Sequence, residues 1–139
     1  MKLMEPRDDE RHEPFWTATR EGILMLPWCN ECDAAFWYPR PVCPRCLGDD
    51  LGWRAAEGTG VVYAVSVQHR PGTGRDVDDG PYAVAVVSLP EGVRMLTNVI
   101  GCDPGDVVVD MAVTVAWHEL SDGRQLPMFE PGSQPTTRE

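Results

Sequence analysis

Four cysteines in two pairs constrain this chain more than any other feature of its sequence. Cys29 and Cys32 form one Cys-x2-Cys pair, and Cys43 and Cys46 form the second after ten intervening residues. Each pair can present two sulfur atoms from one tight turn, and two pairs together complete a tetrahedron around one Zn²⁺ ion. Four thiolates leave no open coordination position, so we expect a structural zinc site. A rubredoxin-type iron site has the same spacing and stays an alternative, as does a redox-active dithiol.

The charge balance excludes several classes of partner. The 139 residues carry 12 Lys and Arg against 22 Asp and Glu, a formal net charge of -10. Nucleic acids and anionic membranes are bound through Lys and Arg, so this balance argues against both. No stretch is long and apolar enough to span a bilayer, and the charged N-terminus lacks the apolar centre of a signal peptide. We expect a cytoplasmic protein, in which thiols stay reduced and bind metal.

Four successive units are expected along the chain. They are an N-terminal arm and helix over residues 1–27, the zinc ribbon over 28–51, a barrel over 52–130 and a disordered tail over 131–139. The first ten residues read as a flexible lead-in. The positions that recur at helical spacing are Phe15, Trp16, Thr19, Ile23 and Leu24. Pro27 prevents any continuation of the helix.

The second half of the chain is rich in β-branched residues and tight turns. Strands are expected over 60–69, 81–89, 93–100, 112–119 and 125–129. Five strands of this kind predict a small antiparallel barrel such as an OB-fold, although the pattern alone does not separate an OB-fold from another small barrel. The connection over residues 70–80 is long, polar and Gly-rich, and connections of this kind are either disordered or functional.

No catalytic constellation is visible in the sequence. The three histidines are scattered, and neither a nucleophile elbow nor a phosphate-binding loop is present. Cys102 has Asp103 and Asp106 close by rather than a base or a cation, so we expect an inert thiol.

Two aromatic clusters are candidates for contact with a partner. Phe15 and Trp16 lie in the expected helix, and Phe36, Trp37, Tyr38 and Arg40 lie between the two cysteine pairs, where the hairpin of a zinc ribbon projects. Aromatic residues and arginine are enriched in binding hot spots. Packing of the same side chains within the chain is the competing interpretation, and both can hold.

Several motifs, taken together, resemble the DUF35 family over about residues 12–130. They are Trp28-Cys-x2-Cys32, Phe36-x-Tyr38-Pro39-Arg40, Cys43-Pro44-x-Cys46, Gly58-x-Gly60-x-Val62-Tyr63, Pro81-Tyr82-x-Val84-Ala85-x-Val87-x-Leu89-x-Glu91-Gly92 and Leu126-Pro127-x-Phe129. The resemblance implies a mainly β protein with an N-terminal helix, a rubredoxin-like zinc ribbon and a five-stranded OB-fold barrel.

The resemblance also implies a function. Members of this family are acyl-CoA-associated partners of thiolase-like enzymes, including homologues of the lipid-transfer type, and the thiolase-like chain carries the chemistry. We therefore expect a noncatalytic accessory subunit of a thiolase or of a retro-aldolase that degrades steroid or lipid side chains. It would stabilise the enzyme and help form the channel for acyl-CoA. A nucleic-acid-binding module and a stand-alone acyl-CoA enzyme are the alternatives.

Phosphate groups of CoA require positive charge. Among six candidate arginines, Arg40, Arg70 and Arg75 lie on segments expected to project and are the expected contacts. A basic surface on the partner is the alternative source of this charge.

Overall fold

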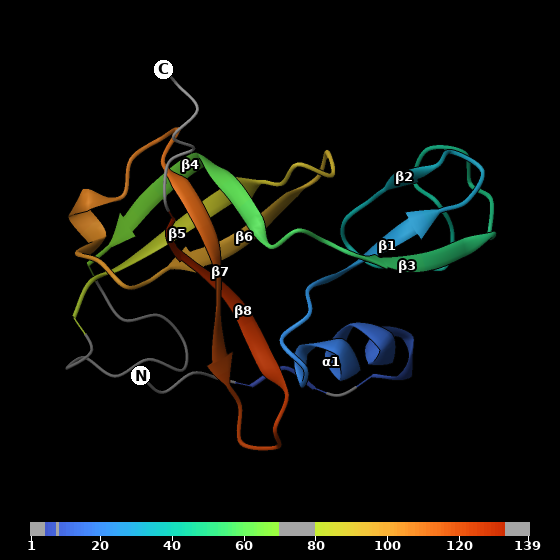
Figure 1. Ribbon diagram of the computed structural model, residues 1–139, viewed down its shortest axis with the longest axis horizontal. Helices are drawn as coiled ribbons and strands as arrows, with labels where there is room; N and C mark the ends of the chain where they lie inside the picture. Colours follow the sequence, from blue (N-terminus) through green and yellow to red (C-terminus); the bar gives the residue numbers. More distant parts are fainter. Residues whose placement is uncertain (1–4, 8, 70–79, 133–139) are drawn as a thin grey trace.

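The computed structural model describes residues 5–7, 9–69 and 80–132. Within these residues a short helical segment, a three-stranded sheet and a closed barrel follow one another along the chain (Figure 1). The ribbon and the barrel lie side by side, and the helix lies below the ribbon and beside β8 in this view. The expected architecture, mainly β with an N-terminal helix, a zinc ribbon and an OB-fold barrel, is confirmed.

The helical segment begins with the 3-10 turn η1 (Glu10–His12), which continues into α1 (Glu13–Thr19). Pro14 lies in the first turn of α1, where the missing N–H costs no intrahelical hydrogen bond. Gly22, with φ of 74°, follows in a turn that redirects the chain. The helical prediction for Ile23 and Leu24 was wrong, because both follow this turn; Leu24 is buried in the extended segment there.

The ribbon contains a sheet in the order β2-β1-β3. The central strand β1 (Met25–Cys29) pairs antiparallel with β2 (Ala34–Ala35) on one side and with β3 (Leu51–Ala55) on the other. Pairing of Met25 with Ala55 carries the sheet beyond both ends of the segment 28–51 that the cysteines indicated.

The barrel closes in the order β4-β5-β6-β8-β7. Its strands are β4 (Thr59–Gln68), β5 (Tyr82–Ser88), β6 (Arg94–Val99), β7 (Ala112–Glu119) and β8 (Gln125–Pro131), with the short helix η3 (Pro104–Asp106) between β6 and β7. All pairs are antiparallel except β6 with β8, which meet in parallel where Val99 lies opposite Phe129. The five expected strands are present.

Alternating burial fills the barrel. Ala83, Ala85 and Val87 of β5 point inward, while the residues between them are half-buried. Gly60 of β4 lies so close to β5 that a Cβ atom there would overlap the Val87 side chain and come within 2.8 Å of the Ser88 carbonyl oxygen. Only glycine fits without movement of the neighbouring strand. Phe15, Leu24 and Leu26 join the same core, so helix, ribbon and barrel share one apolar interior.

The N-terminal arm is fastened to the far end of the chain. Glu5 accepts hydrogen bonds from the backbone N–H and the hydroxyl of Ser121, at 3.0 and 2.8 Å. Arg124 donates from Nη2 to the carbonyl oxygen of Pro6 at 2.8 Å. These residues are therefore held in place, in contrast to the flexible lead-in that the sequence indicated.

Two expectations concern segments that the structure describes only in part. Within the long connection over 70–80, residues 70–79 lie outside the described residues. At the C-terminal end, Pro131 still belongs to β8, and Gly132 donates a backbone hydrogen bond to Ala112 at 2.9 Å. The rest of the expected tail, residues 133–139, lies outside the described residues.

Candidate metal centre and the surfaces around it

The four cysteines of the two pairs come together at the end of the ribbon away from the barrel. Their sulfur atoms all lie within 4.8 Å of one another. Cys29 stands at the end of β1, and the second pair follows the loop after β2. Cys29 and Cys43 are fully buried, whereas Cys32 and Cys46 lie nearer the surface. The group is placed to hold one metal ion.

Backbone N–H groups stabilise thiolates at this site. Cys32 N–H donates to the sulfur of Cys29, and Arg45 N–H donates to the sulfur of Cys43, both at 3.3 Å. Gly48 N–H donates to the sulfur of Cys46 at 3.4 Å. Such donors favour the charged form of a thiol.

The chain takes a left-handed conformation directly after each pair. Asp33 has φ of 52° and Leu47 has φ of 63°. Aspartate tolerates this region better than most residues, as the sequence suggested. After the second pair the left-handed position is Leu47 rather than Gly48, which comes one residue later.

Crowding of the sulfurs shifts their protonation in opposite directions. The backbone N–H of Cys46, followed by that of Arg45, lowers the pKa of Cys43 to about 6 against the effect of burial. At Cys46 the Gly48 N–H favours the thiolate, but the neighbouring sulfur of Cys29, burial and the other two sulfurs together raise the pKa to about 12. A divalent cation removes this conflict, because it coordinates all four sulfurs as thiolates and offsets half of their negative charge. The donor set therefore fits a closed, structural metal site.

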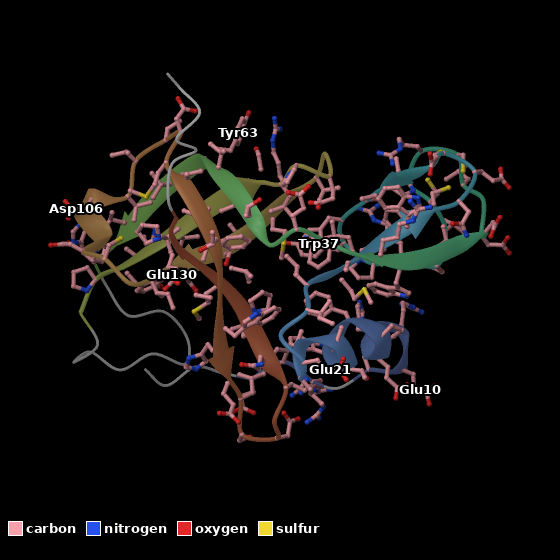
Figure 2. The ribbon with its side chains drawn as sticks, viewed as in Figure 1. Glu10, Glu21, Trp37, Tyr63, Asp106 and Glu130 are labelled. Atoms are coloured by element: carbon pink, nitrogen blue, oxygen red, sulfur yellow. The ribbon has the colours of Figure 1, made fainter. Side chains whose placement is uncertain are left out.

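An apolar groove of about 250 Å³ lies between α1, the loop after β2 and the barrel. Its lining includes the large side chains of Trp16, Trp37, Tyr38, Leu96 and Leu126. Trp37 lies at the meeting point of the ribbon, the barrel and α1 (Figure 2). Tyr38 and Leu96 are 52% and 59% exposed, which is unusual for large apolar side chains beside a core.

The structure places the expected partner-binding residues in two groups. Phe15 and Phe36 are buried in the chain's own interior, at 6% and 2% exposure. Phe15 contacts Trp16 edge-on with ring centroids 5.0 Å apart, and Trp37 at 5.6 Å. Phe15 lines the groove together with Trp16, Trp37 and Tyr38, whereas Phe36 packs with Cys29 and Cys43 inside the ribbon. Contact of this surface with a partner stays a prediction.

The arginines expected to meet CoA are not brought together. Arg40 is exposed and does not line the apolar groove. Arg70 and Arg75 lie outside the described residues. Two arginines that were not singled out, Arg94 and Arg124, have more elaborate surroundings, because Arg94 stacks on Tyr63 and Arg124 on Trp16. Their position in an alternating strand and a turn gave no signal of this.

No nucleophile with a base beside it occurs among the described residues. His12 faces Asp9 on the exposed helical segment at 3.6 Å. Partial burial, together with Asp106 and Asp103, raises the pKa of Cys102 and keeps it a thiol. The described residues also contain no helix long and apolar enough to cross a membrane.

A helix-led zinc ribbon joined to a closed OB-fold barrel defines a known class of two-part protein. Family models match both parts: residues 16–52 as the rubredoxin-like zinc ribbon domain of ChsH2, and residues 53–118 as its C-terminal OB-fold domain. The chain therefore belongs to the DUF35 family, in its ChsH2 branch, as its motifs predicted.

Three similar proteins give this membership a context. A "probable enoyl-CoA hydratase alpha subunit" of Thermomonospora curvata is 35% identical over 132 residues, which cover 94% of this chain and 41% of that protein. The "3-oxo-4,17-pregnadiene-20-carboxyl-CoA hydratase alpha subunit" of Mycobacterium tuberculosis is 36% identical over 122 residues, or 86% of this chain and 38% of that protein. This chain thus spans well under half the length of both relatives.

The third is a solved structure described as "Ltp2-ChsH2(DUF35) aldolase". A chain of that structure superposes with a TM-score of 0.78 at 32% identity, covering 91% of this chain and 98% of its own length. The similarity therefore extends over the whole of that DUF35 chain rather than over a fragment of it.

Proposed function

We propose that this chain is a noncatalytic partner subunit of a thiolase-like acyl-CoA enzyme. The proposed partner is a retro-aldolase that shortens steroid or lipid side chains, and a thiolase is the second candidate. The observation that carries the proposal is the match, over nearly the full length of both chains, to a DUF35 chain of an aldolase described with two components. The names of the two hydratase alpha subunits support a CoA thioester as the substrate of the assembly.

The chemistry of the described residues supports a partner rather than an enzyme. The metal site is closed by four thiolates, and a catalytic zinc needs an open position for water or substrate. Neither Cys102 nor any histidine has the base or cation that nucleophilic catalysis requires. We take the ion itself to be Zn²⁺, because the ribbon matches a zinc ribbon family and zinc prefers a tetrahedron of thiolates.

The apolar groove is the surface proposed for contact with the thiolase-like partner. Its exposed side chains, Tyr38 and Leu96, come from the ribbon and the barrel and adjoin Trp37. An apolar or aromatic side chain of the partner would cover them and bury their area. Phe15 would act indirectly, since its ring packs against Trp37, and Phe36 would act through the ribbon, where it packs with Cys29 and Cys43.

Co-expression with a candidate thiolase-like protein tests the function. We expect the two chains to co-purify, and we expect them to cleave a carbon–carbon bond of an acyl-CoA only when both are present. Turnover by the isolated chain, or full activity of the partner without it, would refute the proposal. Tight binding of single-stranded DNA or RNA at physiological salt would instead favour a nucleic-acid-binding module.

Variants of the groove test the contact surface. Tyr38→Ala combined with Leu96→Ser should weaken assembly while zinc content and the unfolding midpoint stay close to those of the parent chain. Val109→Ser is the matched control, because Val109 is 53% exposed but does not line the groove. Assembly that is equally strong in both variants would place the interface elsewhere.

A further inference from the structure

The seam between the parallel strands β6 and β8 is paired at one position only, where Val99 lies opposite Phe129. Toward the starts of both strands one further contact follows, in which the Thr97 hydroxyl donates to the Pro127 carbonyl oxygen at 3.2 Å. Before Thr97, the described residues of β6 and β8 form no strand pair. β6 therefore has an unpaired edge over its first three residues, Arg94 to Leu96, and we call this segment the open edge.

Pro127 accounts for the end of the pairing. Its carbonyl oxygen faces β6, because the Thr97 hydroxyl reaches it. The nitrogen and the carbonyl group of one strand residue point to the same side, so the nitrogen of Pro127 also faces β6. Proline has no N–H and cannot donate to a neighbouring strand. The backbone of β6 before Thr97 is therefore left without this donor.

The backbone of Leu96 faces the seam rather than β5. In an antiparallel pair, residues that exchange hydrogen bonds with the neighbouring strand alternate with residues that point away from it. Val93 bonds to β5, since its carbonyl oxygen accepts from the Leu89 N–H at 2.9 Å, so Met95 does as well. Ile100, of the opposite parity, bonds to β8. The N–H and C=O of Leu96 thus point toward the seam, where neither makes a hydrogen bond to another described residue.

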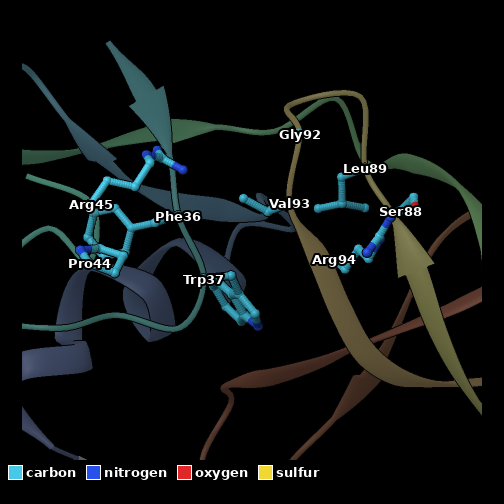
Figure 3. A pocket seen from close by; sticks show the side chains of 9 residues that line it. All are labelled: Phe36, Trp37, Pro44, Arg45, Ser88, Leu89, Gly92, Val93 and Arg94. Carbon is cyan, nitrogen blue, oxygen red and sulfur yellow. The ribbon is translucent and has the colours of Figure 1, made fainter. Parts of the chain in front are cut away.

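The apolar groove begins at this open edge. Met95 and Leu96 line the groove from β6, and Leu126 lines it from β8. Figure 3 shows β6 leaving the β5–β6 hairpin and passing beside Trp37, which belongs to the opposite wall. The groove has a volume of about 250 Å³, below the roughly 300–1,000 Å³ of small-molecule sites. It is therefore better suited to a few side chains of a peptide than to a whole small molecule.

The charge around the groove indicates the side chains of its occupant. No Asp, Glu, Lys or Arg lines the groove, although the chain has 12 basic and 22 acidic residues. Apolar side chains can enter such a lining without leaving a charge buried and unpaired. The net charge of -10 favours basic side chains on the part of the occupant that stays in solvent.

An extended peptide satisfies the open edge and the groove together. When a strand is added to an exposed sheet edge, main-chain hydrogen bonds supply affinity and alternate side chains enter pockets. A residue of the added strand would accept the N–H of Leu96 and donate to its C=O. Apolar side chains on one face of that strand would enter the groove.

We propose that the open edge of β6 and the apolar groove bind an extended peptide segment of a partner chain by strand addition. The segment directs apolar side chains into the groove and basic side chains toward solvent. Its assignment to the thiolase-like partner rests on the function proposed above. The mode of binding does not, because the isolated chain should bind a peptide of this pattern.

NMR titration of the zinc-loaded chain measures this binding and locates it. The probe is the peptide acetyl-Lys-Leu-Lys-Leu-Lys-amide. One control is the same peptide with every backbone N–H methylated, and the second is acetyl-Lys-Pro-Leu-Pro-Lys-amide. We expect saturable binding of the probe, with slower solvent exchange of the Leu96 amide. Both controls should bind roughly tenfold more weakly, because they lack the donors for the open edge.

Three results would overturn the proposal. They are the absence of saturable binding, equal affinity of the probe and a control peptide, and binding that leaves the Leu96 amide unchanged. Protection of the same amide by self-association of the chain alone would assign the edge to a second copy and would also overturn it. Co-purification with a thiolase-like protein is a separate measurement, so the proposed function can stand or fall independently.

A proline at the open edge separates the backbone contact from the side-chain contact. Leu96→Pro removes the N–H that faces the seam but no hydrogen bond to β5. Leu96→Ala is the matched control, because it shortens the side chain and keeps the N–H. We expect Leu96→Pro to bind the probe about fivefold more weakly than Leu96→Ala, and equal affinities would overturn the pairing. Should Leu96→Pro fail to fold, the response of the Leu96 amide in the parent chain decides the question.

Discussion

Arg124 stacks its guanidinium group over the indole ring of Trp16, 4.9 Å from the ring centroid. The same side chain donates to Asp122 Oδ2 at 2.7 Å and to the Pro6 carbonyl oxygen at 2.8 Å. One buried arginine thus joins the N-terminal arm, α1 and the β7–β8 turn. All three elements contribute to or support one side of the apolar groove.

Replacing this arginine should destabilise the fold. We expect Arg124→Met to lower the free energy of unfolding by about 2 kcal/mol, less than the ~3–5 kcal/mol of a wholly buried pair. The discount follows because Asp122 remains 43% exposed and keeps part of its hydration. Urea unfolding followed by tryptophan fluorescence measures the change. Arg54→Met, which removes an exposed ion pair, should cost under about 1 kcal/mol, and equal losses would contradict this account.

Acid should weaken the same turn. The backbone N–H of Arg124 lowers the pKa of Asp122 below its usual value of 3.8; burial opposes this shift, and the Arg124 side chain adds to it. A depressed folded-state pKa contributes stability above the unfolded value, and this contribution is lost as pH falls through the folded pKa. Asp122→Asn should therefore flatten the fall of the unfolding midpoint below about pH 4. Glu21→Gln, on an exposed residue of the turn after α1, should leave that fall unchanged.

Metal removal should loosen the ribbon before the barrel. The buried side chains around the metal site are Cys29, Phe36 and Cys43, which form a small cluster apart from the main core. This cluster is too small to hold the two cysteine pairs together without an ion. A strong chelator, or Cys43→Ser, should accelerate hydrogen exchange of the β1 and β3 amides far more than that of β5. Elemental analysis should give one zinc per chain. An unchanged melting curve after complete metal loss would refute a structural role.

The close approach of β4 to β5 at Gly60 gives a steric prediction. Gly60→Ala should cost about 2–3 kcal/mol, because the new methyl group meets Val87 and the Ser88 carbonyl oxygen. Gly105→Ala is the matched control. A Cβ atom added at Gly105 would lie 3.7 Å from Asp103 Oδ1, which is an ordinary van der Waals contact. Thermal unfolding of both variants decides the matter, and similar midpoints would show that β4 and β5 can separate at little cost.

Local patterns in the sequence predicted the metal ligands and the strands. The cysteine spacing alone specifies which sulfurs meet, and a strand-like run between two turns gave the bounds of β7 as observed, Ala112–Glu119. Both signals are short-range, because ligand turns and strand pleats repeat within a few residues. The start of the ribbon sheet at Met25 was not predicted, since its pairing partner, Ala55, lies beyond the second cysteine pair.

Features that join distant parts of the chain left no local signal. Arg124 contacts Pro6 across 118 positions, and nothing in the turn around Asp122 indicated a partner so far away. Arg45 and Arg94 line one cavity between the ribbon and the β5–β6 hairpin. Arg45 lies within the second cysteine pair and Arg94 begins β6, and these segments meet only after folding. Patterns of composition assign residues to elements, but the apposition of two elements depends on the packing of the whole core.

The link between ribbon and barrel, residues 56–58, is pinned on both sides. Ala56 N–H donates to the Leu24 carbonyl oxygen at 2.7 Å, and Glu57 N–H donates to Glu91 at 2.9 Å. A hinge needs backbone that is free to rotate, and this link has little such freedom. The two cysteine pairs and the β5–β6 hairpin therefore keep a fixed spacing. Because Leu26 of the ribbon shares one apolar core with the barrel, lengthening the link alone would loosen this spacing without separating the two parts.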